Sequence, residues 1–235
     1  MKIIIVGGVA GGMSAATRLR RLMEDAEITI FEKGPFVSFA NCGLPYYVSG
    51  EIANRDSLLV QTPESLKARF NLDVRPFHEV IQISPEEHTV TVRHDGKEFT
   101  ESYDKLILSP GAKPFVPTIE GLAEAKNAYT LRNVPDLDEI MAALDNYPKE
   151  AVIIGAGFIG LEMAENLAKR GLQVTIVEKA PHVLPSLDQE MAAFVQAELV
   201  KNSVRVITSQ SATRFEEQGK VIVLENGQKI TSDLT

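Results

Sequence analysis

The chain has 235 residues, of which 44% are hydrophobic and 24% charged, the profile of a globular protein with one large or two ordinary domains. Its net charge of −8 at pH 7 argues against nucleic acid as a partner, since phosphate binding needs clustered lysine and arginine. No apolar run approaches the roughly 20 residues of a membrane span. A single cysteine without an export signal predicts a reducing, cytoplasmic location.

The first elements predicted are a strand at residues 2–6, a helix at 12–24 and a strand at 27–31, which together open a βαβ unit. The turn after the first strand reads Gly7-Gly8-Val9-Ala10-Gly11-Gly12. Gly7 and Gly12 match the first and third glycines of a dinucleotide-binding turn, while Val9 replaces the middle one. Glu32 ends the second strand, where an acidic residue can bind an adenosine ribose. The pattern predicts a dinucleotide site of irregular form.

The only cysteine lies in the stretch Ser38-Phe39-Ala40-Asn41-Cys42-Gly43-Leu44-Pro45-Tyr46-Tyr47. A single thiol cannot form an internal disulfide, so its redox partner would be a small molecule, an oxygen species or another chain. Pro45 predicts the first turn of a short helix, because proline is tolerated there. Cys42 would then lie at or just before a helix N-terminus, where free N–H groups favour a thiolate. A buried, inert cysteine is the alternative.

A hairpin and a connector follow in the first half. Residues 88–92 alternate in polarity and lead to Asp95-Gly96, a dipeptide that favours a type I′ turn. The chain then returns to a buried strand at 106–108. Several prolines and a predicted helix at 136–146 indicate that residues 114–148 connect two compact units.

The second half repeats the opening of the first in a more regular form. Strands are predicted at 151–154 and 173–177, with a helix at 158–170 between them. The turn Gly155-Ala156-Gly157-Phe158-Ile159-Gly160 is a complete G-x-G-x-x-G motif that can hold a pyrophosphate at the helix N-terminus. Glu178 follows the second strand and would repel a 2′-phosphate, which favours NADH over NADPH. Lys179 beside it leaves NADPH open.

The second half also ends on a hairpin. Residues 220–224 lead to Asn226-Gly227, again a dipeptide that favours a type I′ turn. The chain then stops at Thr235, where the first half continues into its buried strand. From this internal symmetry we expect the sequence to be part of a longer protein.

These patterns predict an α/β protein with two Rossmann-like, three-layer dinucleotide-binding domains, each carrying a β-hairpin. The expected domains are residues 1–113 for the first dinucleotide and 149–235 for NAD(P)H, joined by the connector. Two dinucleotide sites and one thiol imply an electron path in which a nicotinamide gives hydride to a flavin and the flavin reduces sulfur. No metal site is predicted.

Over its whole length the chain resembles the FAD-dependent pyridine nucleotide-disulfide reductases, which implies a glutathione-reductase-like fold. Residues 38–46 carry the most specific likeness, to the active-site motif of coenzyme A-disulfide reductase. That enzyme belongs to the single-cysteine branch, together with NADH oxidase and NADH peroxidase. Other branches use a cysteine pair, whereas the flanking positions here are Val37 and Tyr47.

The resemblance implies a role for each matching position. Cys42 would cycle between a thiolate and a mixed disulfide with coenzyme A, and Asn41 and Ser38 would share its site. FAD would contact Gly7, Gly8, Ala10, Gly11, Gly12, Glu32, Lys33, Val80, Ser109, Gly111 and Arg132. NAD(P)H would contact Gly155, Gly157, Phe158, Ile159, Gly160, Glu178 and Lys179. Coenzyme A would contact Ser14, Arg18, Arg21, Ser38 and Asn41.

Arg18 and Arg21 suit the three phosphates of coenzyme A, because residues three apart share one helix face. An ordinary solvated basic face is the alternative for these two arginines. For Ser38 and Asn41 the alternative is local turn capping.

The implied activity is reduction of coenzyme A disulfide, or of a related small disulfide or persulfide, by NAD(P)H through FAD and Cys42. NADH peroxidases carry a histidine where this chain has Ala10, so a disulfide is favoured over a peroxide as the oxidant. The alternatives are an NADH oxidase or peroxidase that uses a Cys42 sulfenic acid, and a catalytically silent nucleotide-binding fragment. The family's third flavin motif and the C-terminal domain through which its members form homodimers are expected beyond residue 235.

Overall fold

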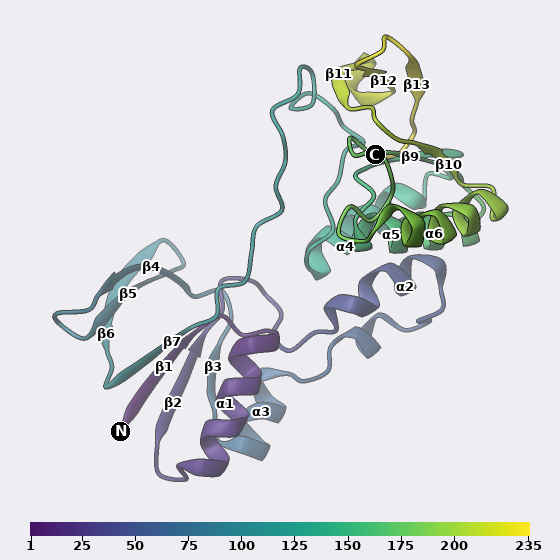
Figure 1. Ribbon diagram of the computed structural model, residues 1–235. Helices are drawn as coiled ribbons and strands as arrows, with labels where there is room; N and C mark the ends of the chain where they lie inside the picture. Colours follow the sequence, from purple (N-terminus) through teal and green to yellow (C-terminus); the bar gives the residue numbers. More distant parts are fainter. The chain divides into compact units, whose positions relative to one another are not determined.

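The computed structural model describes residues 1–235, and its contacts divide the chain into two compact units (Figure 1). Unit 1 comprises Met1–Ala40 and Arg55–Lys113, and unit 2 comprises Asn41–Asn54 and Pro114–Thr235. The predicted first domain, residues 1–113, includes the segment Asn41–Asn54, whereas the contacts place that segment in unit 2. The predicted connector, residues 114–148, also belongs to unit 2. No helix combines the length and apolar character needed to cross a membrane.

Unit 1 is built on a parallel sheet with the strand order β3-β2-β1-β7. Its elements are β1 (Lys2–Val6), α1 (Ala10–Leu22), β2 (Glu27–Phe31), η2 (Arg55–Leu58), α3 (Pro63–Phe70), β3 (Asp73–Arg75), β4 (Glu79–Ser84), β5 (Thr89–His94), β6 (Lys97–Ser102) and β7 (Lys105–Leu108). The side chains of β1 alternate between the two faces of the sheet, as the pleat requires. Ile3 and Ile5 pack with residues of α1 and α3, while Ile4 packs with Val90 and Val92 of β5. Unit 1 therefore has three layers: helices, a parallel sheet and the antiparallel sheet β4-β5-β6.

The turn between β5 and β6 has the predicted type I′ geometry. Asp95 has φ 48° and Gly96 has φ 72°, and both central residues of this turn need positive φ. Helix α1 begins at Ala10, two residues before the predicted start, so the glycine turn itself forms the first turn of the helix.

Unit 2 repeats this plan with the parallel sheet β10-β9-β8 and the antiparallel sheet β11-β12-β13. Its elements are η1 (Asn41–Gly43), α2 (Leu44–Ser49), α4 (Val134–Leu144), β8 (Glu150–Ile154), α5 (Phe158–Lys169), β9 (Gln173–Val177), α6 (Gln189–Lys201), β10 (Arg205–Ile207), β11 (Ala212–Glu216), η3 (Glu217–Gly219), β12 (Val221–Leu224) and β13 (Lys229–Thr231). Val152 and Val177 of the parallel sheet pack with Phe215, Ile222 and other residues of the antiparallel sheet. Leu234 forms a parallel bridge with Ala151, so it lies beside β8 as β7 lies beside β1.

The second hairpin differs from the prediction of a type I′ turn. Leu224 N donates to Gln228 O at 2.8 Å, so the loop has three residues, 225–227, instead of two. Gly227 has φ 82°, while Asn226 is absent from the residues with positive φ. The type I′ prediction is wrong here because the extra residue lets one glycine provide the left-handed conformation alone. Asn226 Oδ1 instead accepts a hydrogen bond from Gln228 N at 2.9 Å.

Glu101 on β6 joins three strands of unit 1 through charged hydrogen bonds. It accepts from Lys2 Nζ at 2.5 Å and from Arg75 Nη1 at 3.1 Å. Arg75 also donates to Asp73 at 2.6 Å. The bond from Lys2, and then the bond from Arg75, hold the pKa of Glu101 below its usual value against the opposing effect of burial. A carboxyl whose pKa is lowered on folding stabilises the fold above its unfolded pKa and loses that contribution as pH falls.

Glu101→Gln should therefore lower the free energy of unfolding at pH 7 by about 1 kcal/mol, since the network is partly solvent-screened. The difference from the unsubstituted chain should shrink as pH falls below about 4, the ordinary range of a glutamate, and should vanish once the native carboxyl is protonated as well. Urea unfolding at pH 7 and pH 3.5 would measure both values. Glu98→Gln on the same strand is the matched control, because Glu98 and its partner Arg93 are half-exposed. A loss of the same size at both pH values would contradict the assignment.

Candidate functional site

The first glycine turn closes tightly on the sheet of unit 1. A Cβ atom on Gly7 would lie 2.0 Å from Ser109 O, and one on Gly12 would lie 1.8 Å from Gly7 O. Both contacts involve backbone atoms, so a side chain at Gly7 would displace the backbone that follows β7, and one at Gly12 would push α1 away from β1 and the turn. Helix α1 has Val9 as its N-cap and no side-chain cap, which leaves its first amide groups for an anion.

The second glycine turn follows the same plan but leaves more room. A Cβ on Gly160 would lie 2.2 Å from Gly155 O, whereas one on Gly157 would have no neighbour within 4 Å. Gly155 has φ +104°, which favours glycine. The N-cap of α5 is Gly157, again without a side-chain cap. A phosphate group can therefore approach the backbone at Gly157 closely.

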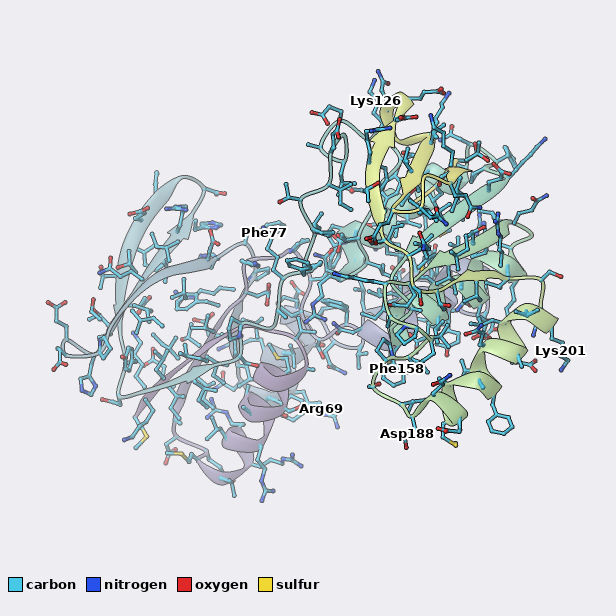
Figure 2. All side chains as sticks on the ribbon, turned by 45° about the horizontal axis from the view of Figure 1, so that its top comes forward. Arg69, Phe77, Lys126, Phe158, Asp188 and Lys201 are labelled. Carbon is cyan, nitrogen blue, oxygen red and sulfur yellow. The ribbon has the colours of Figure 1, made fainter.

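An open cavity of about 820 Å³ adjoins the second turn within unit 2. Its wall includes the predicted residues Gly155, Gly157, Phe158, Ile159 and Gly160. Phe158 is 64% exposed, and its side chain is labelled in Figure 2. The structure thus brings the residues of the motif together at one accessible surface.

The acidic residue of each unit is bonded to its own glycine turn. Glu32 accepts hydrogen bonds from Gly8 N and Gly34 N, both at 2.8 Å. Glu178 accepts from Ala156 N at 2.6 Å and from Ala180 N at 2.7 Å. Sequence reasoning did not predict these bonds, although the equal placement of the two carboxylates is one sign of the internal symmetry. Each carboxylate fixes the turn at the end of a strand, where a ribose would be bound.

Cys42 lies in η1, directly before α2, and Pro45 is in the first turn of that helix, as predicted. The thiol is exposed, so the alternative of a buried cysteine is wrong. Leu44, Pro45 and Val48 of α2 are buried. Asn41 and Cys42 belong to unit 2 by their contacts, while Ser38 belongs to unit 1.

A second cavity, of about 410 Å³, lies in unit 1 between α1 and α3. It brings together three of the residues predicted to contact coenzyme A, namely Ser14, Arg21 and Ser38. Arg18 lies outside its lining and is exposed on α1. Ser38 has φ 47°, and its N–H donates to Gly8 O at 2.9 Å, which links this cavity to the first glycine turn.

Sequence reasoning missed two polar residues of this cavity, Gln61 and Arg69. Arg69 lies in the last turn of α3, three residues after the buried Leu66 (Figure 2). Thr62, Pro63 and Ser65 form the start signal of this helix, with a capping box. That signal could have identified α3 and the face on which Arg69 lies.

The remaining predicted residues fall in both units. Ser109 follows β7 and touches the first turn, since a Cβ on Gly11 would lie 2.4 Å from Ser109 Oγ. Val80 packs with Phe31 on the hairpin side of the sheet. Lys33 and Gly111 follow β2 and β7 in unit 1, whereas Arg132 and Lys179 lie in unit 2.

The entire chain, residues 1–235, matches the family model described as pyridine nucleotide-disulphide oxidoreductase. The chain belongs to this family. The predicted resemblance and the α/β fold with two Rossmann-like units are therefore confirmed. Members of this family are oxidoreductases, and the one cysteine of the chain agrees with the single-cysteine branch.

Curated relatives of the chain include coenzyme A disulfide reductases of several Staphylococcus species. The one from Staphylococcus haemolyticus is 44% identical over 202 residues, which cover 84% of this chain and 45% of the relative. One from Staphylococcus epidermidis is 39% identical over 233 residues, covering 98% of this chain and 50% of the relative. The chain thus spans about half the length of these proteins.

Solved structures of the family superpose closely on the chain. Reduced Bacillus anthracis CoADR-RHD is 51% identical with a TM-score of 0.98, covering 99% of this chain and 42% of that one. An NAD-dependent persulfide reductase from A. fulgidus is 37% identical with a TM-score of 0.95, covering 100% and 45%. A water-forming NADH oxidase from Lactobacillus brevis is 28% identical with a TM-score of 0.92, covering 100% and 52%.

Both glycine turns fit the dinucleotides that the family implies. In each, a helix N-terminus without a side-chain cap meets a turn of glycines, and a carboxylate lies at the end of the next strand. The second turn also has empty space at Gly157, where a pyrophosphate would be bound.

Proposed function

We propose that the chain is part of an FAD-dependent NAD(P)H:disulfide oxidoreductase that reduces coenzyme A disulfide through Cys42. The observation that carries the proposal is an exposed, solitary thiol in the same chain as two glycine turns. The relatives named as coenzyme A disulfide reductases support this substrate.

The two turns would hold the two dinucleotides. The first turn, with Glu32, Lys33, Val80, Ser109, Gly111 and Arg132, would bind FAD, and the second turn, with Glu178 and Lys179, would bind the nicotinamide dinucleotide. When bound, FAD supplies the two-electron chemistry that links a nicotinamide to a disulfide. The carboxylate of Glu178 is held in place by two backbone N–H groups and disfavours a 2′-phosphate, so NADH is the preferred donor.

Cys42 supplies the sulfur chemistry. Its thiolate attacks one sulfur of the disulfide, forms a mixed disulfide with one coenzyme A and releases the other as a thiolate. Two electrons that originate from NADH then break the mixed disulfide, which frees the second coenzyme A and restores the Cys42 thiolate. The balance is one NADH, one proton and one disulfide converted to NAD⁺ and two thiols.

The cavity in unit 1 would hold the phosphates of coenzyme A. Arg21 and Arg69 carry the positive charge at its wall, and Ser14, Ser38 and Gln61 add hydrogen-bonding groups. Guanidinium groups bind phosphate through paired N–H donors, which suits a ligand with three phosphates. Gln61 and Arg69 join the predicted residues in this role.

A persulfide is the second candidate substrate. The persulfide reductase that superposes on the whole chain supports it, because a persulfide sulfur is open to the same attack by Cys42. An oxidase or peroxidase is less favoured, since Ala10 offers no acid–base group from the first glycine turn.

The mass of this proposed oxidoreductase, the parent protein of the chain, tests the proposal when it is measured under non-reducing conditions. We expect it to be purified yellow and, after exposure to coenzyme A disulfide, to gain one coenzyme A on Cys42 that dithiothreitol removes. A Cys42 adduct of one or two oxygens without coenzyme A would indicate the oxidase or peroxidase. A colourless protein that binds NADH and forms no adduct would indicate a silent nucleotide-binding protein.

A further inference from the structure

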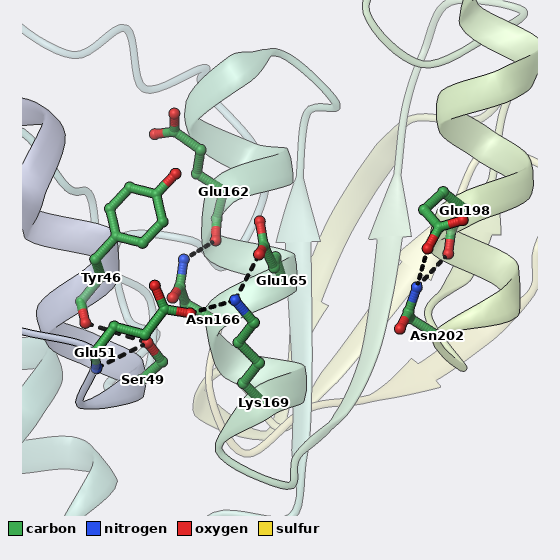
Figure 3. Close-up of polar contacts among 9 residues, drawn as sticks. All are labelled: Tyr46, Ser49, Glu51, Glu162, Glu165, Asn166, Lys169, Glu198 and Asn202. Carbon is green, nitrogen blue, oxygen red and sulfur yellow. Dashed lines mark hydrogen bonds and ion pairs between the residues drawn. The ribbon is translucent and has the colours of Figure 1, made fainter.

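The helix that follows Cys42 is held by the C-terminal end of α5. Both elements belong to unit 2, and they lie side by side in Figure 3. Arg170 Nη1 donates to Val48 O at 2.9 Å. Lys169 Nζ contacts a carboxylate oxygen of Glu51, which lies just beyond α2.

Arg170 supplies a hydrogen bond at the C-terminal end of α2. Tyr46 O accepts from Ile52 N at 3.1 Å, and Tyr47 O accepts from Gly50 N at 3.1 Å. Val48 O has its bond from Arg170, the C-cap residue of α5. A helix of six residues is marginal by itself, and a cation at its C-terminal end complements the dipole. The arginine therefore acts as a C-terminal cap for α2 supplied from α5.

Lys169 adds a charged link between the same two elements. It bonds to Glu165 on its own helix at 2.6 Å and to Glu51 on the other side. These two carboxylates, Glu165 foremost, raise the pKa of Lys169. Lys169 is thus charged at physiological pH and bonds both to Glu165 of α5 and to Glu51, which lies just beyond α2.

Asn166 lies one turn before Arg170 on α5 and is fully buried. Its Nδ2 donates to Glu162 O at 2.7 Å, while its Oδ1 has no hydrogen-bond partner. A buried acceptor without a donor costs stability.

We propose that Lys169 and Arg170 are positioning residues for the Cys42 thiol. They fix the helix that begins two residues after the thiol to α5, whose N-terminus forms the second glycine turn. Helix α5 thus has the second glycine turn at its N-terminus and the residues that hold α2 at its C-terminal end. The role assigned to the thiol rests on the proposed function, whereas the grip on α2 can be measured without it.

Arg170→Met and Lys169→Met in the parent protein test this role. Backbone amides of residues 44–52 should exchange with deuterium about tenfold faster in Arg170→Met and about threefold faster in Lys169→Met. Lys169→Arg should restore the parent rate, since it keeps the charge between both carboxylates. Lys201→Met is the matched control, because Lys201 pairs within α6, with Glu198.

A second readout separates positioning from a merely structural contact. Mixed-disulfide formation between Cys42 and coenzyme A disulfide needs an oriented thiol, so it should slow about tenfold in Arg170→Met. Alkylation by iodoacetamide needs only exposure and should change less than twofold. Unchanged deuterium exchange in both variants would show that Lys169 and Arg170 do not hold α2. Faster exchange with equal effects on both thiol reactions would overturn the positioning role. If the parent protein itself forms no coenzyme A adduct, the proposed function fails. The exchange rates still test whether Lys169 and Arg170 hold α2.

Discussion

Cys42→Ser is expected to abolish disulfide reduction by the flavin-loaded parent protein, with a loss of roughly a thousandfold or more. A serine hydroxyl is not ionised at neutral pH and cannot form a disulfide, and the chain has no second cysteine to replace it. NADH-dependent reduction of the flavin should persist, because neither glycine turn includes residue 42. Stopped-flow absorbance follows the flavin step, and release of free coenzyme A follows the thiol step.

The fold should tolerate this substitution. The thiol is exposed, so the free energy of unfolding should change by less than about 0.5 kcal/mol. Ser49→Ala on α2 is a matched control, since it alters a hydroxyl at the other end of the helix and leaves the thiol in place. If Cys42→Ser still turned over coenzyme A disulfide at the parent rate, the thiol mechanism would have to be given up.

The sequence predicted the parts of the fold that depend on local rules. Gly12 and Gly160 were identifiable because only glycine allows the helix to lie so close to the preceding turn. The first hairpin followed from Asp95-Gly96, but the second did not, because loop length is set by strand register and not by the dipeptide. Hairpin geometry therefore needs the pairing of both strands as well as the turn residues.

The site was less accessible to sequence reasoning where it depends on distant contacts. Lys169 and Glu51 lie 118 positions apart, and no spacing rule relates them. Likewise, Arg69 joins Ser14 and Arg21 only because α3 packs beside α1 on one face of the sheet. Motifs located the turns and the thiol, while the residues that hold and surround them required the tertiary structure.

Gly157→Ala and Gly160→Ala should separate nucleotide binding from folding in the second turn. Gly157 has φ −76° in an extended conformation that alanine also adopts, and its Cβ would enter empty space. The cost to stability should be about 0.5 kcal/mol, from a poorer N-cap. The added methyl group would occupy the place where backbone meets the pyrophosphate, so NADH affinity should fall about tenfold or more.

Gly160→Ala should have the opposite profile. Its Cβ would lie 2.2 Å from Gly155 O and 3.3 Å from Ile153 Cγ2, so α5 must move away from β8 at a cost of about 3 kcal/mol. Urea unfolding and NADH titration on both variants give the four values needed. A Gly157→Ala protein with normal stability and normal NADH affinity would exclude this turn as the nucleotide site. Because α5 also holds α2, a displaced helix in Gly160→Ala should disturb residues 44–52 as well, whereas Gly157→Ala should leave their hydrogen exchange unchanged.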